Sequence, residues 1–309
     1  MVVTLFVIIS VTFFISKLLP GTPFADDKLT PETRAQLFQK YGLDEPLLVQ
    51  YAKYMLNVAQ GDLGNSFYYE SRPVVEMIMD QLPVSMFIGV QAMIFGLVIG
   101  LALGIVAALR HNTAWDTVAV VLAVLGVSVP SFVLGPLLQY WLGVRFELFP
   151  IAFFESWMHS VLPSLALSVF VVSTVARFVR SEMLEVLGQD YITLAKAKGL
   201  SGLAVIIRHV LRNAMIPLVT VLAPLTVYLI TGSLVVEQIF AVPGIGEQFI
   251  QSVRVNDYSM IFGTTIFFSV MFIVALLIQD IMYGVIDPRI RVAGDGAIST
   301  GSSDDGGGV

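Results

Sequence analysis

The sequence predicts an all-α, polytopic membrane protein with six transmembrane helices. Of the 309 residues, 56% are hydrophobic and only 13% are charged, an apolar content above what the core of one soluble domain uses. The apolar residues gather into stretches of about 20, the length at which a helix crosses about 30 Å of hydrocarbon. Six such stretches lie at residues 2–19, 84–109, 117–142, 160–179, 214–236 and 261–284.

The first stretch, which begins MVVTLFVIISVTFF, carries no basic residue before Lys17. A secretory signal peptide is the alternative, but such a peptide has a charged n-region and a small-residue cleavage site, and this stretch has neither. We therefore assign residues 1–20 to a first transmembrane helix. We also expect that a short cytoplasmic start is missing from this sequence.

Basic residues predict the orientation, because connections rich in Lys and Arg stay on the cytoplasmic side. The loop at residues 21–83 has five basic residues against nine acidic ones, so we place it outside as an extracytoplasmic cap. Its apolar residues recur at helical intervals after Pro46, which indicates an ordered cap. Both termini are then cytoplasmic, together with the basic residues Arg110, Arg177, Arg180, Lys196, Lys198, Arg208, Arg212, Arg289 and Arg291.

Residues 84–292 are predicted to form one transmembrane core, interrupted by a cytoplasmic loop at residues 181–213. The tail, residues 293–309, contains the segment GDGAISTGSSDDGGGV, which offers almost nothing to bury. We expect this tail to be disordered; a cloning remnant is the alternative origin for it.

Several classes of function lack the residues that they need. The net charge of −6 repels nucleic acid, and without cysteine there is no disulfide, thiolate nucleophile or Cys-ligated metal. The three histidines, His111, His159 and His209, are too scattered for a metal site. A phosphate-binding loop needs a Gly-Lys dipeptide, and none occurs. If nucleotide energy drives this chain, a partner supplies it.

The predicted spans hold few groups that could carry a coupling ion. For Asp280 we favour a buried carboxylate paired with a neighbouring helix or water over a proton relay. Gln91 and Gln139 are expected to form interhelical hydrogen bonds rather than to bind a ligand. A row of glycines at helical spacing predicts one smooth face for close helix packing: Gly96, Gly100 and Gly104.

The cytoplasmic loop predicts a helix, a glycine turn and a second helix. Its first helix carries an apolar stripe at helical spacing, which ends before Gly199, a residue that takes positive φ without strain. The stripe consists of Leu187, Tyr191, Leu194 and Ala195, with Lys198 next along it. Small side chains at Ala195 and Ala197 would let a partner approach closely. The residue pattern favours such a docking element and an amphipathic interfacial connector equally.

The residues of this loop resemble those of a known family. The segments ARFVRSEMLEVLGQDYITLAKAKGL and RHVLRNAMIPLV look like the cytoplasmic EAA loop of permease subunits of bacterial ABC importers, in the dipeptide and oligopeptide branch. The similarity runs from Leu19 to Arg291. Other matching stretches are DEPLLVQYAKYM, GDLGNSF, GVSVPSFVLGPLL, VVEQIFAVPGIG and DPRIR.

The chain departs from the family pattern at some positions. Where the general motif has Glu-Ala-Ala before its glycine, this sequence has Thr193, Leu194 and Ala195. Arg212 stands where the general pattern has proline after the second helix, and Ser259 stands where the branch tends to have proline.

The resemblance implies the type I ABC importer permease (MetI-like) fold and a subunit without chemistry of its own. It implies a homologous second permease, two cytoplasmic ATPase subunits that use ATP and Mg, and an extracytoplasmic substrate-binding protein. The ATPase-coupling residues would be Tyr191, Thr193, Leu194, Ala195, Lys196, Ala197, Lys198 and Gly199. Candidates for the outer mouth of the path, for which a plain turn is the alternative, are Glu237, Phe240, Pro243, Gly244 and Gly246.

The predicted function is import of oligopeptides or dipeptides across the bacterial cell membrane. Nickel and glutathione importers share this permease branch, so both substrates stay open. An ion-coupled secondary transporter or a stand-alone channel would need intramembrane ion ligands or pore-forming repeats, neither of which the sequence displays.

Overall fold

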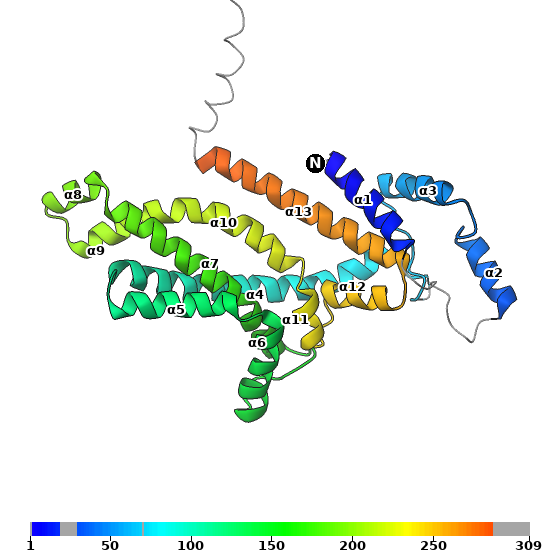
Figure 1. Ribbon diagram of the computed structural model, residues 1–309, viewed down its shortest axis with the longest axis horizontal. Helices are drawn as coiled ribbons and strands as arrows, with labels where there is room; N and C mark the ends of the chain where they lie inside the picture. Colours follow the sequence, from blue (N-terminus) through cyan, green and yellow to red (C-terminus); the bar gives the residue numbers. More distant parts are fainter. Residues whose placement is uncertain (1, 19–29, 70, 287–309) are drawn as a thin grey trace, which may run out of the picture.

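The computed structural model describes residues 2–18, 30–69 and 71–286, and in these ranges the chain is helical apart from loops and one isolated β-bridge between Asn65 and Pro73. The all-α prediction is therefore confirmed. Figure 1 shows an elongated bundle with two short helices, α2 and α3, near one end and two others, α8 and α9, at the opposite end. The predicted tail at residues 293–309 lies outside the described residues.

The elements follow one another along the chain as a series of long helices joined by short ones. They are α1 (Val2–Ser16), α2 (Pro31–Lys40), α3 (Leu47–Ala59), α4 (Val74–Leu109), α5 (Ala114–Ser128), α6 (Ser131–Leu138), the π-helix η1 (Gln139–Arg145), the 3-10 helix η2 (Trp157–Ser160), α7 (Val161–Leu187), α8 (Asp190–Ala197), α9 (Gly202–Val205), the π-helix η3 (Ile206–Leu211), α10 (Arg212–Ile230), α11 (Leu234–Ile239), α12 (Ile245–Arg254) and α13 (Tyr258–Ile286).

Four helical units in the described ranges are long and apolar enough to cross a membrane: Val74–Leu109, Trp157–Leu187, Gly202–Ile239 and Tyr258–Ile281. A fifth candidate is the bent pair of Ala114–Ser128 with Ser131–Arg145, and α1 is a shorter apolar helix. The chain is thus a multi-pass membrane protein, although the predicted count of six spans is not reproduced. Two spans also extend further than predicted, because α4 begins at Val74 and α7 continues to Leu187.

The third predicted span, residues 117–142, is broken rather than continuous. Its two halves meet at an angle of 102°. The break falls at Val129, which is extended (φ −92°, ψ 113°), and at Pro130, which follows it. Proline disfavours the helical conformation of the residue before it and donates no hydrogen bond, so the helix ends there.

The central packing contact of the bundle is between α4 and α7. A Cβ added at Gly100 would lie 2.8 Å from the Cβ of Val175, and one added at Gly104 would lie 2.7 Å from the carbonyl oxygen of Ala176. Such a distance is too short for any side chain, so glycine is required for this approach. A Cβ at Gly96 would meet α7 in the same way, so the predicted glycine face is confirmed.

Two glutamines in this region form hydrogen bonds between elements, as predicted. Gln91 on α4 accepts a hydrogen bond from the Ser164 hydroxyl on α7 at 2.8 Å. The Nε2 of Gln139 donates to the carbonyl oxygens of Ile151 and Ile239, at 2.7 and 3.1 Å. Asp280 is exposed on this chain, so the described helices do not bury it, and its pairing with a neighbouring helix or water stays a prediction.

Candidate functional site

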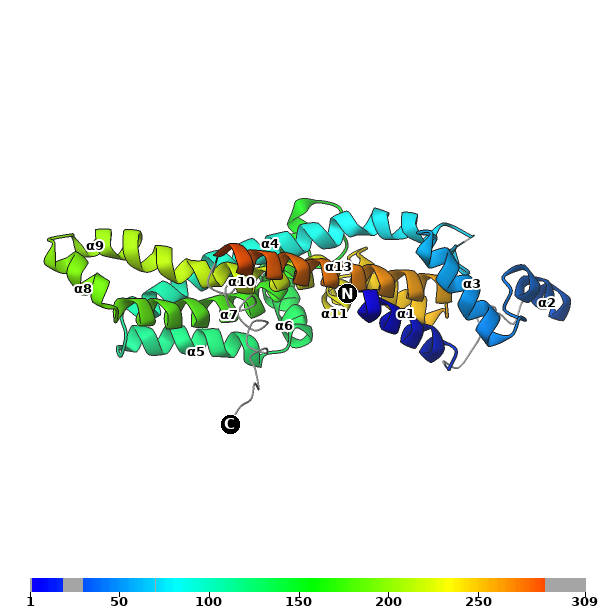
Figure 2. The ribbon, with the colours of Figure 1, turned by 90° about the horizontal axis from the view of Figure 1, so that it is seen from above.

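A helical hairpin, residues 190–205, lies at one end of the molecule between the long helices α7 and α10 (Figures 1 and 2). It consists of α8, a turn at Gly199, and α9. Gly199 has a φ of +79°, which confirms the predicted positive-φ turn. The Ser201 hydroxyl then accepts a hydrogen bond from the N–H of Ala204 and caps α9 at its start. The predicted sequence of helix, glycine turn and helix is present.

The apolar stripe predicted for the first helix of the hairpin is wrong. The helix is interrupted at Gly188 and Gln189, so Leu187 is the last residue of α7. The helix α8 begins after this interruption, and its residues do not continue the helical spacing of α7. The buried side of α8 is Ile192 and Ala195, which share a core cluster with side chains of α9 and η3. Ala195 is only 6% exposed, so a partner cannot approach it directly.

The outer side of the hairpin carries apolar and basic side chains together. Leu194 is 55% exposed and Leu203 is 68% exposed, so the hairpin presents two large apolar side chains on its surface. The other exposed positions of the hairpin tip are Tyr191, Thr193, Lys196, Ala197, Lys198 and Gly199. Of the eight residues that the resemblance assigns to coupling, the structure brings seven to this surface and turns one, Ala195, inward.

A charged cluster next to the hairpin joins α5 to α7. The Arg180 guanidinium donates two hydrogen bonds to the buried Asp116 carboxylate, at 2.7 and 2.9 Å. The N–H of Asn112 donates to the same carboxylate at 3.0 Å, and Nδ1 of His111 lies 3.0 Å from it. The Arg180 side chain is partly exposed, so solvent screening makes this pair worth less than a fully buried one.

The Asp116–Arg180 pair was missed by sequence reasoning, because the two residues lie 64 positions apart and Asp116 comes just before the predicted third span. The pair fixes the turn between α4 and α5 to the part of α7 that leads into the hairpin.

The segment predicted to lie at the outer mouth is folded around a buried carboxyl group. Glu237 and Phe240 are each 1% exposed, and Pro243 is exposed. One oxygen of Glu237 accepts a hydrogen bond from the Ser85 hydroxyl at 2.8 Å. The other accepts from the N–H groups of Gly246, at 2.8 Å, and Glu247, at 3.1 Å.

The glycines of this segment leave room for that carboxyl group. A Cβ added at Gly246 would lie 2.9 Å from the carboxyl of Glu237, and one added at Gly244 would overlap it. The N–H of Ile245 donates to the Ser85 hydroxyl at 3.0 Å, so α4, α11 and α12 all meet at this point. Glu237 therefore faces the protein interior, and the place of this segment at the path stays a prediction.

A cavity of about 220 Å³ lies where the third span is broken. Pro130 has no N–H to offer the carbonyl of Gly126, and irregular backbone of this kind is tolerated at membrane depth only against protein or a cavity. Besides the residues of the break, the wall includes Ser131, Phe170, Tyr228 and Ser233. Most of the lining is apolar, and Ser131, Tyr228 and Ser233 add polar groups to it.

The chain matches two protein-family profiles. Residues 100–292 match the family described as binding-protein-dependent transport system inner membrane component. Residues 1–89 match the N-terminal part of the membrane components of binding-protein-dependent transport systems. Together these matches cover the cap, the spans and the hairpin.

Curated relatives align over nearly the whole chain. The dipeptide transport system permease protein DppB of Lactococcus lactis is 45% identical, over 94% of this chain and 96% of its own. DppB of Bacillus subtilis is 44% identical, over 94% and 95%. The oligopeptide transport system permease protein OppB of Escherichia coli is 37% identical, over 93% and 95%.

A solved structure shares the fold. It is titled as the crystal structure of an amino acid ABC transporter with histidines, and it aligns with a TM-score of 0.52 over 70% of this chain and 94% of its own, at 15% identity. At this level of identity the similarity shows a shared fold and nothing further. On the profile matches and the relatives, this chain belongs to the family of binding-protein-dependent transport system inner membrane components and has the fold of an ABC importer permease.

Proposed function

We propose that this chain is a permease subunit of an ATP-driven importer of dipeptides or oligopeptides. It forms half of the translocation path, and a homologous second permease forms the other half. Two cytoplasmic ATPase subunits bind ATP and Mg, and an extracytoplasmic binding protein delivers the substrate. The names of the relatives, dipeptide and oligopeptide permeases at 37–45% identity, support the peptide substrate.

The exposed face of the hairpin is the observation that carries this proposal. Leu194 and Leu203 are apolar and open, and the same hairpin also exposes the basic side chains of Lys196 and Lys198. A surface that combines exposed apolar side chains with a charged rim is typical of a protein-docking site. The hairpin sits at the end of the bundle opposite α2 and α3, where an ATPase on the cytoplasmic side would meet it (Figure 1).

Helices connect the hairpin to the rest of the bundle, so a shift of the hairpin would also move these helices. It is joined to the bundle by α7, which runs unbroken from Val161 to Leu187, and by a helical run from Gly202 to Ile230. The Asp116–Arg180 pair ties α7 to α5 at the same end. ATP binding to the partners would shift the hairpin, and the attached helices would follow as rigid bodies toward an outward-facing state.

The path would run along the side of the chain where the third span is broken. The cavity at Pro130 and Ser131 offers polar groups at membrane depth, which a peptide backbone needs as it crosses. The N- and C-termini are proposed to lie in the cytoplasm of a bacterial cell, with residues 21–83 outside.

Uptake by the reconstituted complex tests the proposal. The chain is co-expressed with its second permease and ATPase subunits, placed in proteoliposomes with the binding protein, and supplied with a labelled dipeptide, a labelled pentapeptide, nickel or glutathione. We expect peptide uptake that requires ATP on the ATPase side. Uptake of nickel or glutathione alone would replace the peptide assignment, and uptake by this chain alone under an ion gradient would overturn the ATP-driven importer.

A further inference from the structure

The helix α3 divides its surface into three sides with different surroundings. One side packs onto the protein: Tyr51 and Tyr54 contact the aromatic rings of Phe13, at centroid distances of 5.4 and 5.8 Å. A second side is polar, and a third is exposed and apolar. The third side follows helical spacing over three turns and consists of Leu48, Ala52, Leu56 and Ala59.

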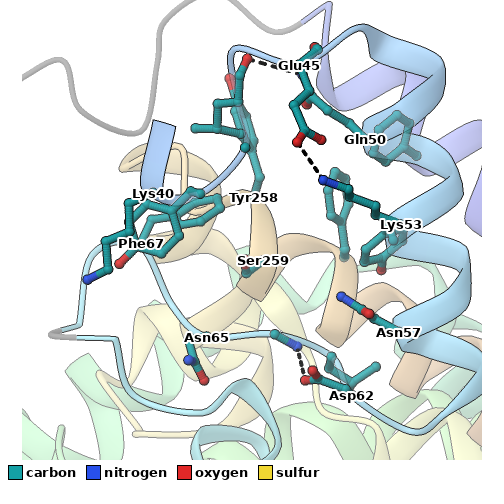
Figure 3. Close-up of a pocket in the computed structure, with 18 of the residues that line it drawn as sticks. Lys40, Glu45, Gln50, Lys53, Asn57, Asp62, Asn65, Phe67, Tyr258 and Ser259 are labelled. Carbon is teal, nitrogen blue, oxygen red and sulfur yellow. Dashed lines mark hydrogen bonds and ion pairs between the residues drawn. The ribbon is translucent and has the colours of Figure 1, made fainter. Parts of the chain in front are cut away.

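The polar side of α3 faces a pocket. Figure 3 shows Gln50, Lys53 and Asn57 directed from α3 toward a cavity of about 440 Å³. The other walls come from the loops before and after α3, the ends of α1 and α2, and the start of α13. Lys53 pairs there with Glu45 at 2.5 Å. Burial raises the pKa of the Tyr54 hydroxyl at the same pocket well above its ordinary value. The polar side chains of α3 thus line a pocket of this chain, away from the apolar side.

The apolar side has no such surroundings on this chain. Leu48 is 72% exposed and Leu56 is 61% exposed, and no charged residue lies between them on that side. Leaving leucine side chains in water forfeits about 1.5–3 kcal/mol each relative to burial. Something apolar therefore covers this side in the assembled protein.

The position of α3 beside α1 identifies what covers it. The Tyr51 hydroxyl is 2.6 Å from the hydroxyl of Ser10, and the Tyr51 ring is 5.3 Å from that of Phe14. Ser10 lies six residues before the end of α1, so α3 meets that apolar helix roughly 9 Å inside its end. Phe14 and Val11 are exposed on α1, and their apolar surface continues through Tyr51 to Leu48.

We propose that α3 lies in the membrane interface, with Leu48, Ala52 and Leu56 against the acyl chains of the leaflet in which α1 ends. Its polar side then faces the pocket, and Tyr51 and Tyr54 pack against α1 on the remaining side. Figure 2 shows α3 running obliquely to the long helices of the bundle. The cap is then held by lipid as well as by α1.

Fluorescence quenching tests this placement in the assembled importer. The chain has no cysteine, so single cysteines are introduced by Leu48→Cys and Leu56→Cys, with Lys53→Cys and Asn57→Cys as matched controls on the polar side of the same helix. Each is labelled with bimane and reconstituted in phosphatidylcholine–phosphatidylglycerol vesicles. One arm contains lipid with a nitroxide near the top of the acyl chain, and the other contains iodide in the water.

Because interfacial helices bury their apolar side about 5–10 Å into this region, we expect nitroxide lipid to quench Leu48→Cys and Leu56→Cys at least about twofold more than the two controls. Iodide should show the reverse order. Strong iodide quenching at all four positions would overturn the proposal. So would protection of positions 48 and 56 from both quenchers, since that result would mean that the binding protein or a second permease covers α3.

Discussion

The turn of the hairpin depends on one residue, Gly199, whose φ of +79° belongs to the left-handed region. Nothing lies within 4 Å of a Cβ added there, so a substitution would act through backbone strain and not through a clash. A side chain in that region costs about 1–2 kcal/mol. Without a partner the substituted turn relaxes out of that region, so this cost opposes binding. We expect Gly199→Val to weaken ATPase binding roughly 5–30-fold.

Gly202 provides the matched control for that prediction. It also has open space around its Cβ, but its φ is not in the left-handed region. Co-purification of the ATPase subunits and substrate-stimulated ATP hydrolysis should therefore be nearly normal in Gly202→Val. Equal effects of the two substitutions would show that the turn at Gly199 has no special part in coupling.

The Glu237 carboxyl accepts hydrogen bonds from backbone N–H groups, so substitutions of Glu237 should differ in stability according to whether they keep an acceptor. Glu237→Ala leaves the N–H groups of Gly246 and Glu247 without an acceptor, at about 1–3 kcal/mol for each unsatisfied group. Glu237→Gln keeps a carbonyl oxygen that can accept both and loses only the acceptor of the Ser85 hydroxyl, so it should cost less than Glu237→Ala. Thermal unfolding of the detergent-purified chain measures the difference; equal melting temperatures for the two variants would contradict this role of Glu237.

At the scale of elements, the contact of α4 with α7 should not tolerate added volume. Gly100→Val places side-chain atoms where Val175 already lies, and such overpacking costs about 1–3 kcal/mol. Ala102 is exposed on the same helix, so Ala102→Val is the control and should change stability little. The yield of folded chain and its melting temperature in detergent report both. A normal Gly100→Val protein would mean that the helices are not in such close contact.

Local signals made some of these elements predictable, and others depend on contacts far along the chain. The turn at Gly199 and the face at Gly100 follow from what glycine alone permits. The break after Val129 was missed because the apolar stretch continues through Pro130. Hydropathy averaged over a window does not reveal that proline lacks the N–H that a continuous helix needs. The burial of Ala195 could not be predicted, because it follows from the direction in which the chain leaves Gly188.

The candidate site was predictable to the same extent. The hairpin and its glycine turn lie within one continuous motif, so the sequence located them, and the family resemblance placed Leu194 among the coupling residues. The partners of Asp116 and Glu237 come from helices 64 and 152 residues away. A single sequence contains no sign of such pairs, since either carboxylate alone resembles an ordinary loop or interfacial residue.

At the scale of the whole molecule, the orientation predicted from the basic residues places α3 and the hairpin on opposite sides of the membrane, in agreement with their positions at opposite ends of the bundle (Figure 1). A cysteine introduced at Gln60, after α3, should react with a membrane-impermeant maleimide added outside intact cells. A cysteine at Lys198 should react only after the membrane is opened. Both positions are exposed on the chain. The reverse labelling pattern would invert the proposed topology.

The central claim is that ATPase subunits drive this chain through the exposed face of the hairpin. Leu194→Asp tests it with the least disturbance, because that side chain is 55% exposed and does not support the hairpin from within, as Ala195 does. Tyr68→Asp is the control, since Tyr68 has the same exposed fraction in the cap at the other end of the molecule.

The decisive measurement is the amount of ATPase subunit that co-purifies with each variant at equal membrane expression. Placing a carboxylate in an apolar contact should weaken binding by more than about 1.4 kcal/mol, which is tenfold. We predict that Leu194→Asp loses the ATPase subunits while Tyr68→Asp retains them. Normal co-purification and normal ATP-driven uptake with Leu194→Asp would contradict the account and leave the hairpin as a connector on the membrane surface.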